Sequence, residues 1–157
     1  MTIEGRNVYL YDVKLQARLE QVVGKIGKGA TIAILDALSQ FGDENRQPME
    51  RARALVTYII RQTALTYQLD PDKFLISSLP EYRDARMVSV YLARKYSPLS
   101  RKNLCGQFHL NERQLRYCED RMREINSIPQ FHKTFLQPVE VLDQTIKEFL
   151  NHIKQSH

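Results

Sequence analysis

The sequence has few cysteines and no long apolar run, and these absences limit the classes of protein to which it can belong. Two cysteines in 157 residues cannot form a disulfide framework, and both fall on expected helices near apolar neighbours, which indicates the reduced thiols of a cytoplasmic protein. The longest apolar runs fall far short of the roughly 20 residues that span a bilayer. No apolar segment near the N-terminus has the pattern of a signal peptide. The sequence therefore predicts a cytoplasmic protein with no membrane span.

Residue sets that indicate catalysis or metal binding are also missing. The four histidines are scattered: His109, His132, His152 and His157. No His, Cys and carboxylate set has metal-ligand spacing, and Cys105 with His109 is more simply a core thiol and a turn residue than a nucleophile and its base. The glycines of Gly24–Gly29 lack the Gly-Lys-Ser/Thr of a phosphate-binding loop and indicate a flexible connector. The sequence thus predicts a binding protein without metal or cofactor, not an enzyme.

Apolar residues recur at helical spacing along most of the chain, which is 43% hydrophobic and has no repeat or low-complexity tract. Helices are expected at Val13–Val23, Ala30–Phe41, Met49–Tyr67, Lys73–Ile76, Arg83–Tyr96 and Pro138–Ile153, in addition to the helices described below. Pro80 is expected to stop the short helix Lys73–Ile76, and Asn7–Asp12 is a short strand or an extended arm. The predicted fold class is all-α, a helical bundle with extra N- and C-terminal helices.

Positive charge is concentrated in one segment of the chain. Between positions 83 and 123 there are ten basic side chains: Arg83, Arg86, Arg94, Lys95, Arg101, Lys102, Arg113, Arg116, Arg121 and Arg123. The same segment has four acidic side chains, so its net charge exceeds the +5 of the whole chain. Clustered cations suit DNA phosphates, because binding releases counterions in proportion to the contacts made. A solvated helix face is often rich in the same residues, so charge alone does not distinguish the two.

The segment Leu99–Ile125 has the pattern of two helices joined by a tight turn, as in the helix-turn-helix of DNA-binding proteins. Ser100 is expected to cap a supporting helix at Arg101–Phe108, and Asn111 to cap the recognition helix that follows. His109 stands where glycine is usual, and histidine tolerates the left-handed conformation of such a turn better than most residues. A helix pair of the same spacing that serves only for packing is the alternative.

Helical spacing divides this segment into buried and exposed positions. The small core is expected to contain Leu104, Cys105, Phe108, Leu110, Leu115, Cys118, Met122 and Ile125. The exposed positions of the recognition helix are then Glu112, Arg113, Gln114, Arg116, Tyr117 and Asp120.

Residue chemistry then predicts which side chains contact DNA. Base recognition is assigned to Arg113, Gln114, Arg116 and Tyr117. Arginine and glutamine are among the side chains that pair bidentately with guanine and adenine edges. Contacts to the DNA backbone are assigned to Ser100, Arg101, Lys102 and Asn111. The start of a supporting helix commonly meets the phosphates, which is the reason for assigning Ser100, Arg101 and Lys102.

Several segments follow one another in the order found in a known DNA-binding domain: Tyr58–Tyr67, Leu69–Leu75, Arg83–Tyr96, Leu99–Ser100 and Leu104–Phe108. Through them, the stretch from Val56 to about Ile125 resembles the C-terminal domain of the bacterial replication initiator DnaA, a Trp-repressor-like helix-turn-helix. The resemblance implies that fold and a DNA contact for Arg86 and Arg101. Where the initiator has Gly-Arg-Asp-His-Thr-Thr, this chain has the shorter His109–Leu115, so the initiator's target sequence is not implied. The chain also lacks the Walker motif of the initiator's ATPase module.

These observations predict sequence-specific binding of double-stranded DNA by a regulator of transcription or replication. The chain divides into a helical extension at residues 1–47, a DNA-binding domain at 48–126 and a C-terminal helix at 127–157. The alternative is a helical protein-interaction module that does not bind DNA. The terminal helices must bury their apolar faces, and a homodimer or a partner protein would cover them. Salt distinguishes the two functions, because phosphate-driven binding weakens steeply with salt and an apolar interface does not.

Overall fold

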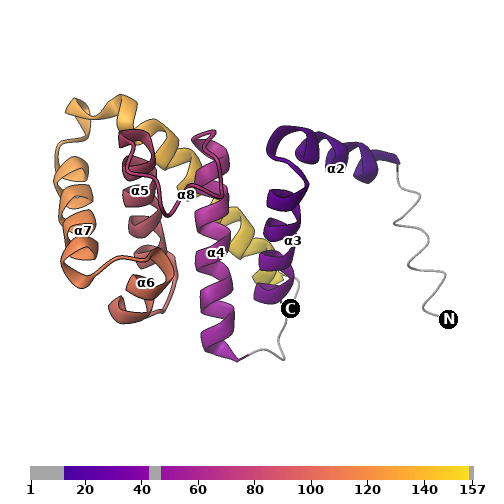
Figure 1. Ribbon diagram of the computed structural model, residues 1–157, viewed down its shortest axis with the longest axis horizontal. Helices are drawn as coiled ribbons and strands as arrows, with labels where there is room; N and C mark the ends of the chain where they lie inside the picture. The colour runs from indigo at the N-terminus through magenta and orange to yellow at the C-terminus, as the bar shows by residue number, and fades with distance from the viewer. Residues whose placement is uncertain (1–12, 43–46, 156–157) are drawn as a thin grey trace.

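The structure, a computed structural model, describes residues 13–42 and 47–155, and these residues form helices and turns without a strand (Figure 1). The α-helices are α2 (Val13–Ile26), α3 (Lys28–Gly42), α4 (Pro48–Thr66), α5 (Pro80–Tyr96), α6 (Arg101–Phe108), α7 (Glu112–Ser127) and α8 (Lys133–Gln155). A short 3-10 helix, η1 (Pro129–Phe131), precedes α8. The predicted all-α class is confirmed. None of the described helices is long and apolar enough to span a membrane.

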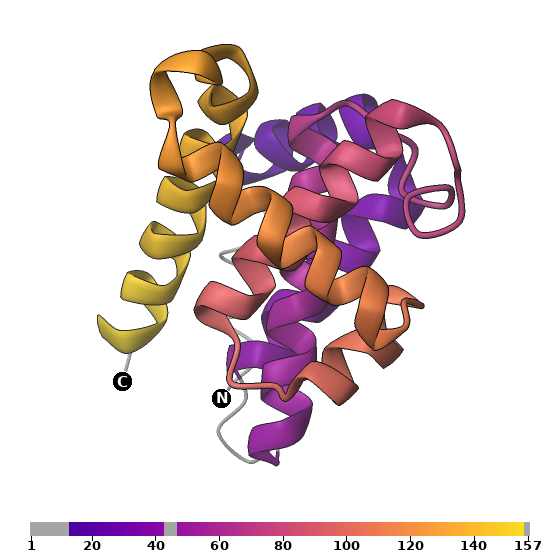
Figure 2. The ribbon, with the colours of Figure 1, turned by 90° about the vertical axis from the view of Figure 1, so that its left-hand side faces the viewer.

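The long helix α4 lies at the centre of the bundle (Figure 1). It packs against α3, α5 and α8, and α7 packs against α5. Figure 2 shows α7 crossing obliquely over the side of the molecule that is opposite α3. The largest fully buried side chains come from α4 to α8 and from the turns that precede α5: Val56, Ile59, Phe74, Val88, Val90, Leu92, Leu104, Phe108, Leu115, Met122, Leu142 and Ile146. Helices α4 to α8 therefore share one core, which fixes how α7 is presented to solvent.

Two prolines have positions that differ from the predictions. Pro80 does not stop a helix but begins α5, where its missing N–H is not needed, and Lys73–Ile76 forms turns around the buried Phe74 instead of a helix. Helix α8 begins at Lys133 and continues through Pro138, which was predicted to be its start. Burial of Leu136 and Val139 on either side of this proline keeps the segment helical despite the lost hydrogen bond. Tertiary burial thus overrides the local signal in both places.

The connector predicted at Gly24–Gly29 is shorter than expected, because only Gly27 lies outside the helices. Its φ of 84° is in the left-handed region, which glycine adopts without steric cost. The N–H of Gly27 donates to the carbonyl of Val23 at 2.8 Å, and its own carbonyl accepts from the N–H of Thr31 at 3.1 Å. The predicted extent of the connector is therefore wrong, and the glycine makes a hydrogen-bonded corner between α2 and α3. The predicted strand or arm at Asn7–Asp12 lies outside the described residues.

A carboxylate on α8 joins this helix to the end of α5. Asp143 accepts hydrogen bonds from the Tyr96 hydroxyl at 2.6 Å and from the Lys95 ammonium at 2.8 Å, and it pairs with Lys147 at 3.1 Å. Burial alone would raise the pKa of Asp143, but these three donors outweigh it and hold the pKa below its ordinary value. Burial and the carboxylate raise the pKa of Tyr96 well above its usual value.

We expect replacement of Asp143 by asparagine to destabilise the fold by about 1–3 kcal/mol at neutral pH. The folded-state pKa of Asp143 is lowered, so its contribution is present above the unfolded pKa of about 4 and is lost as pH falls through the folded value. Urea unfolding of both proteins between neutral and acidic pH measures this. The difference in unfolding free energy should shrink below about pH 4. A difference that stays constant with pH would show that Asp143 acts by packing alone.

Candidate nucleic-acid interface

A side chain caps the start of each helix in the α6–α7 pair. The Ser100 hydroxyl accepts from the N–H of Asn103 at 3.3 Å and begins α6. The Asn111 side chain accepts from the N–H of Gln114 at 2.8 Å, and the Gln114 carbonyl Oε1 accepts from the N–H of Asn111 at 2.9 Å. This reciprocal pair is a capping box, which satisfies two backbone donors at the start of α7. Both predicted caps are confirmed.

The turn between the two helices depends on one left-handed residue. His109 has φ 54° and ψ 40°, the conformation predicted for this position. It lets the N–H of Leu110 donate to the carbonyl of Cys105 at 3.0 Å, which closes the end of α6. The chain then reverses within two residues and enters α7.

The exposed and buried faces of α7 agree with the prediction. Leu115, Met122 and Ile125 are buried against the core, and Cys118 is half-buried. The predicted exposed positions are all exposed: Glu112, Arg113, Gln114, Arg116, Tyr117 and Asp120. Tyr117 is the most exposed large hydrophobic side chain of the helix, with 62% of its surface accessible. A face with arginine, glutamine and tyrosine is thus presented to solvent by a helix whose other face is fixed in the core.

Tertiary structure divides the ten cations of the basic segment into two sets. Half of them are paired with carboxylates, and one of these pairings joins three helices. Glu119 of α7 lies 2.7 Å from Nε of Arg94 on α5 and 2.9 Å from Nη2 of Arg101 on α6. Only 11% of the Glu119 side chain is exposed, so this carboxylate holds both guanidinium groups at the junction of the helices. Arg101 is therefore occupied by an internal partner.

The other three paired cations bind carboxylates either within α7 or on α8. Arg121 pairs with Glu124 at 2.9 Å, and Arg123 with Asp120 at 3.0 Å. Lys95 pairs with Asp143 of α8 at 2.8 Å. Apart from Arg86, four cations of the segment have no ion pair within the described part of the chain: Arg83, Lys102, Arg113 and Arg116.

Arg86 has a different internal role. Its Nη1 donates a hydrogen bond of 2.8 Å to the carbonyl of Phe74, which ties α5 to the preceding turns. Burial and the neighbouring Arg83 lower the pKa of Arg86 from its usual value. An arginine still carries its charge after such a shift, because its usual pKa lies far above neutral pH. Arg86 therefore contributes positive potential while its guanidinium is held against the protein backbone.

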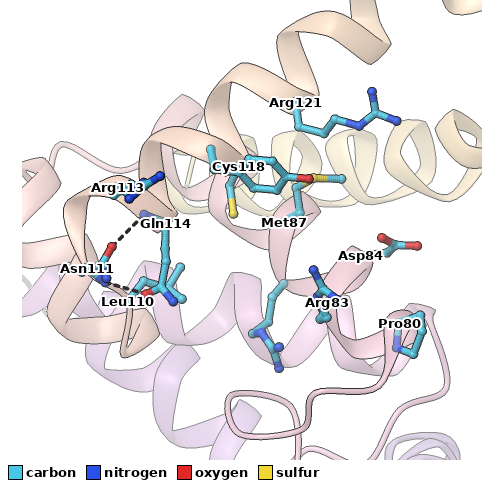
Figure 3. A pocket seen from close by; sticks show the side chains of 12 residues that line it. Pro80, Arg83, Asp84, Met87, Leu110, Asn111, Arg113, Gln114, Cys118 and Arg121 are labelled. Carbon is cyan, nitrogen blue, oxygen red and sulfur yellow. Dashed lines mark hydrogen bonds between the residues drawn. The ribbon is translucent and has the colours of Figure 1, made fainter.

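An open groove of about 590 Å³ lies between the first half of α5 and the exposed face of α7 (Figure 3). Four arginines line it: Arg83, Arg86, Arg113 and Arg121. Tyr117 and the half-buried Cys118 also line the groove, and Asp84 is its acidic residue. Burial raises the pKa of the Cys118 thiol, which opposes a negative charge there. The groove is consequently electropositive with an aromatic side chain in its wall.

Sequence reasoning did not assign Arg83 to the site, although it lines this groove and has no ion pair within the described residues. The available signal was its spacing from Arg86, because residues three apart share one face of a helix.

Two residues assigned to the site, Asn111 and Gln114, also have a structural role that competes with DNA contact. The capping box uses Oε1 of Gln114 and Oδ1 of Asn111, whereas bidentate reading of adenine requires both polar atoms of an amide.

Removal of the cap at Asn111 tests its structural role. We expect Asn111→Ala to lower the free energy of unfolding by about 0.5–2 kcal/mol, since a backbone N–H at the start of α7 loses its acceptor. Asn111→Asp keeps an acceptor at the same position and should retain most of the stability. Urea unfolding of the two variants measures this. Equal stability of Asn111→Ala and the unchanged protein would contradict a structural role for the cap.

Among the described residues, no group of three His, Cys, Asp or Glu side chains is placed to hold a metal ion. Comparisons of the chain with models of protein families, with curated proteins and with solved structures find no match. The resemblance to the DnaA C-terminal domain therefore stays a prediction from the sequence.

Proposed function

We propose that this chain binds double-stranded DNA, with α7 in the major groove and α6 against the phosphate backbone, as a helix-turn-helix does. The observation that carries the proposal is the pattern of ion pairing on α7. Arg113 and Arg116 lie exposed near its start without an acidic partner among the described residues, whereas Arg121 and Arg123 near its end are paired. In helix-turn-helix proteins, the N-terminal residues of the recognition helix contact base edges.

The exposed side chains of the first turns of α7 suit base recognition. A guanidinium group forms two parallel hydrogen bonds with O6 and N7 of guanine, and Arg113 and Arg116 are available for such contacts. Tyr117 offers a hydroxyl and an apolar ring from the wall of the groove beside them. Gln114 retains only its amide donor while the capping box is formed, so we assign it a supporting role.

Contacts to the DNA phosphates are best supplied by the cations that have no internal partner. Lys102 lies in the first turn of α6, where backbone N–H groups also favour an anion. Arg83 lies on α5 at the other side of the groove. Arg101 would contact phosphate only after leaving Glu119, and Arg86 only after leaving the carbonyl of Phe74. These two arginines therefore contribute to DNA binding chiefly through their charge.

Within this proposal, the protein acts by binding, without catalysis and without a metal or cofactor, as a cytoplasmic regulator of transcription or replication. The resemblance of residues 56–125 to the DnaA C-terminal domain supports a role in replication, and the general helix-turn-helix pattern supports either process. The departure of His109–Leu115 from the initiator's reading stretch supports a target sequence of its own.

Fluorescence anisotropy with a labelled random duplex across a series of KCl concentrations tests the proposal. Phosphate contacts by Lys102 and Arg83 predict that the logarithm of the binding constant falls with the logarithm of salt with a slope of about −2. Selection from a random-sequence library should then enrich a common motif. No binding at low salt, or binding that does not respond to salt, would overturn the proposal and favour a protein-interaction module instead.

A further inference from the structure

Helix α2 presents an apolar stripe that is partly exposed to solvent. None of its residues is buried. Leu15, Leu19, Val22 and Val23 are each exposed by about 40%. Their spacing of three and four residues places them on one face of the helix. Figure 1 shows α2 extending outward from its corner with α3. A soluble helix with one apolar face normally buries that face against another element, so this stripe is an incomplete interface.

The stripe continues into a groove of about 960 Å³ between α2, α3 and α4. Apolar side chains from the three helices form much of its lining: Val22, Ile26, Ile34, Ala64 and Leu65. The exposed stripe and the groove together form one surface long enough for a helix to lie along, because the fourteen residues of α2 alone extend about 21 Å. We call this surface the α2 groove.

Cations border the α2 groove. Lys25 of α2 and Arg61 of α4 both line it, and neither has an ion pair within the described residues. Arg18 follows the same edge of the stripe as Lys25, since they lie four positions before and three after Val22. Asp70 is the acidic residue in the lining, and its carboxylate accepts from the N–H of Asp72 at 2.9 Å. An occupant of the groove therefore meets an apolar floor and two cations from different helices.

We propose that the α2 groove docks an amphipathic helix of a partner protein whose polar face is acidic. The apolar face of that helix covers the stripe, and its carboxylates pair with Lys25 and Arg61. A second copy of this chain is disfavoured, because it would bring Arg18 and Lys25 of two protomers together. A flat bilayer surface fills a concave groove poorly.

The α2 groove lies on the opposite side of the molecule from the helix proposed to bind DNA. Helices α2 and α3 lie on one side of α4, and α7 lies on the other, as both views show (Figures 1 and 2). DNA on α7 leaves the α2 groove accessible. The partner helix and DNA should therefore bind at the same time, and failure of one activity does not imply failure of the other.

The test uses the full chain and two fluorescently labelled synthetic helices with the same leucine face. One peptide carries glutamates on its polar face and the other carries lysines. We expect the glutamate peptide to bind with an affinity that falls as salt rises, and the lysine peptide to bind at least tenfold more weakly. Lys25→Glu/Arg61→Glu should weaken the glutamate peptide at least tenfold. Leu19→Ser/Val22→Ser should also weaken it.

A matched control changes the net charge by the same amount on α8, none of whose residues lines the α2 groove. Lys133→Glu/Lys154→Glu alters two exposed lysines of α8 and should leave peptide binding within about twofold, and circular dichroism confirms the fold of each variant. Equal binding of both peptides, or of neither, would overturn the proposal. Self-association in sedimentation that Leu19→Ser/Val22→Ser abolishes, without peptide binding, would identify a second copy as the occupant. Binding to vesicles of anionic lipid without peptide binding would identify a membrane surface.

Discussion

Replacing Arg113 and Arg116 together by alanine is expected to abolish sequence-specific DNA binding while leaving the fold intact. Each guanidinium that reads a base edge contributes about 1–3 kcal/mol of discrimination, so the double variant should bind its selected site hardly better than random DNA. If either arginine also neutralises a phosphate, its removal makes the salt slope shallower by about 1. Both side chains are exposed and without an ion pair within the described residues, so their removal leaves no carboxylate uncompensated. Anisotropy with the selected duplex and with random DNA measures both effects.

Arg121→Ala/Arg123→Ala is the matched control. It removes the same two charges from the same helix and has the same effect on long-range attraction, but these arginines are paired with Glu124 and Asp120. We expect this control to lose affinity equally for selected and random DNA and to keep its preference between them. If the two double variants lose the same amount of specificity, then the start of α7 is not the reading element. Comparison of the two double variants thus separates direct contact with the bases from general electrostatic attraction to DNA.

Leu115→Ala should produce the largest loss of stability among the substitutions considered for the helix pair. Leu115 is fully buried one turn into α7. Truncation of a buried leucine removes apolar burial and leaves a cavity, which together cost about 2–5 kcal/mol. We expect a lower urea midpoint with an unchanged slope. A loss below about 1 kcal/mol would show that α7 can shift to fill the cavity.

Tyr117→Ala is the complementary variant, because Tyr117 lies two positions along the same helix and is 62% exposed. Its stability should stay within about 0.5 kcal/mol of the unchanged protein. Its affinity for DNA should fall, since the ring and hydroxyl in the groove wall are removed. Loss of stability without loss of affinity would instead place Tyr117 in a packing role. The two variants together distinguish the face that builds the core from the face proposed to meet DNA.

The helix pair could be predicted closely because its determinants are local. Ser100 and Asn111 cap helices through bonds to residues three positions away, and the spacing of Leu115, Met122 and Ile125 selects the buried face. The left-handed turn at His109 likewise follows from its position at the end of α6. Such contacts are set within one helical turn, so neighbouring residues in the sequence are sufficient to indicate them.

Predictions that depended on distant burial were less successful. Lys73–Ile76 does not form a helix, because these turns position Phe74 in the core and present its carbonyl to Arg86, twelve positions along the chain. Pro138 lies inside α8, where burial of its neighbours compensates for the missing N–H. In both places, a strong local signal was outweighed by packing against helices that are remote in sequence.

The sequence by itself determined the all-α class, the bounds and caps of α6, the cap of α7 and the exposed face of α7, since periodicity and capping act over three or four residues. Only the tertiary structure decided which cations are available. Arg101 meets Glu119 eighteen positions away, and Lys95 meets Asp143 forty-eight positions away. These pairs exist because the packed core brings particular helix faces together. The same packing leaves Arg113 and Arg116 without an ion pair in the described structure and leaves the apolar stripe of α2 partly exposed.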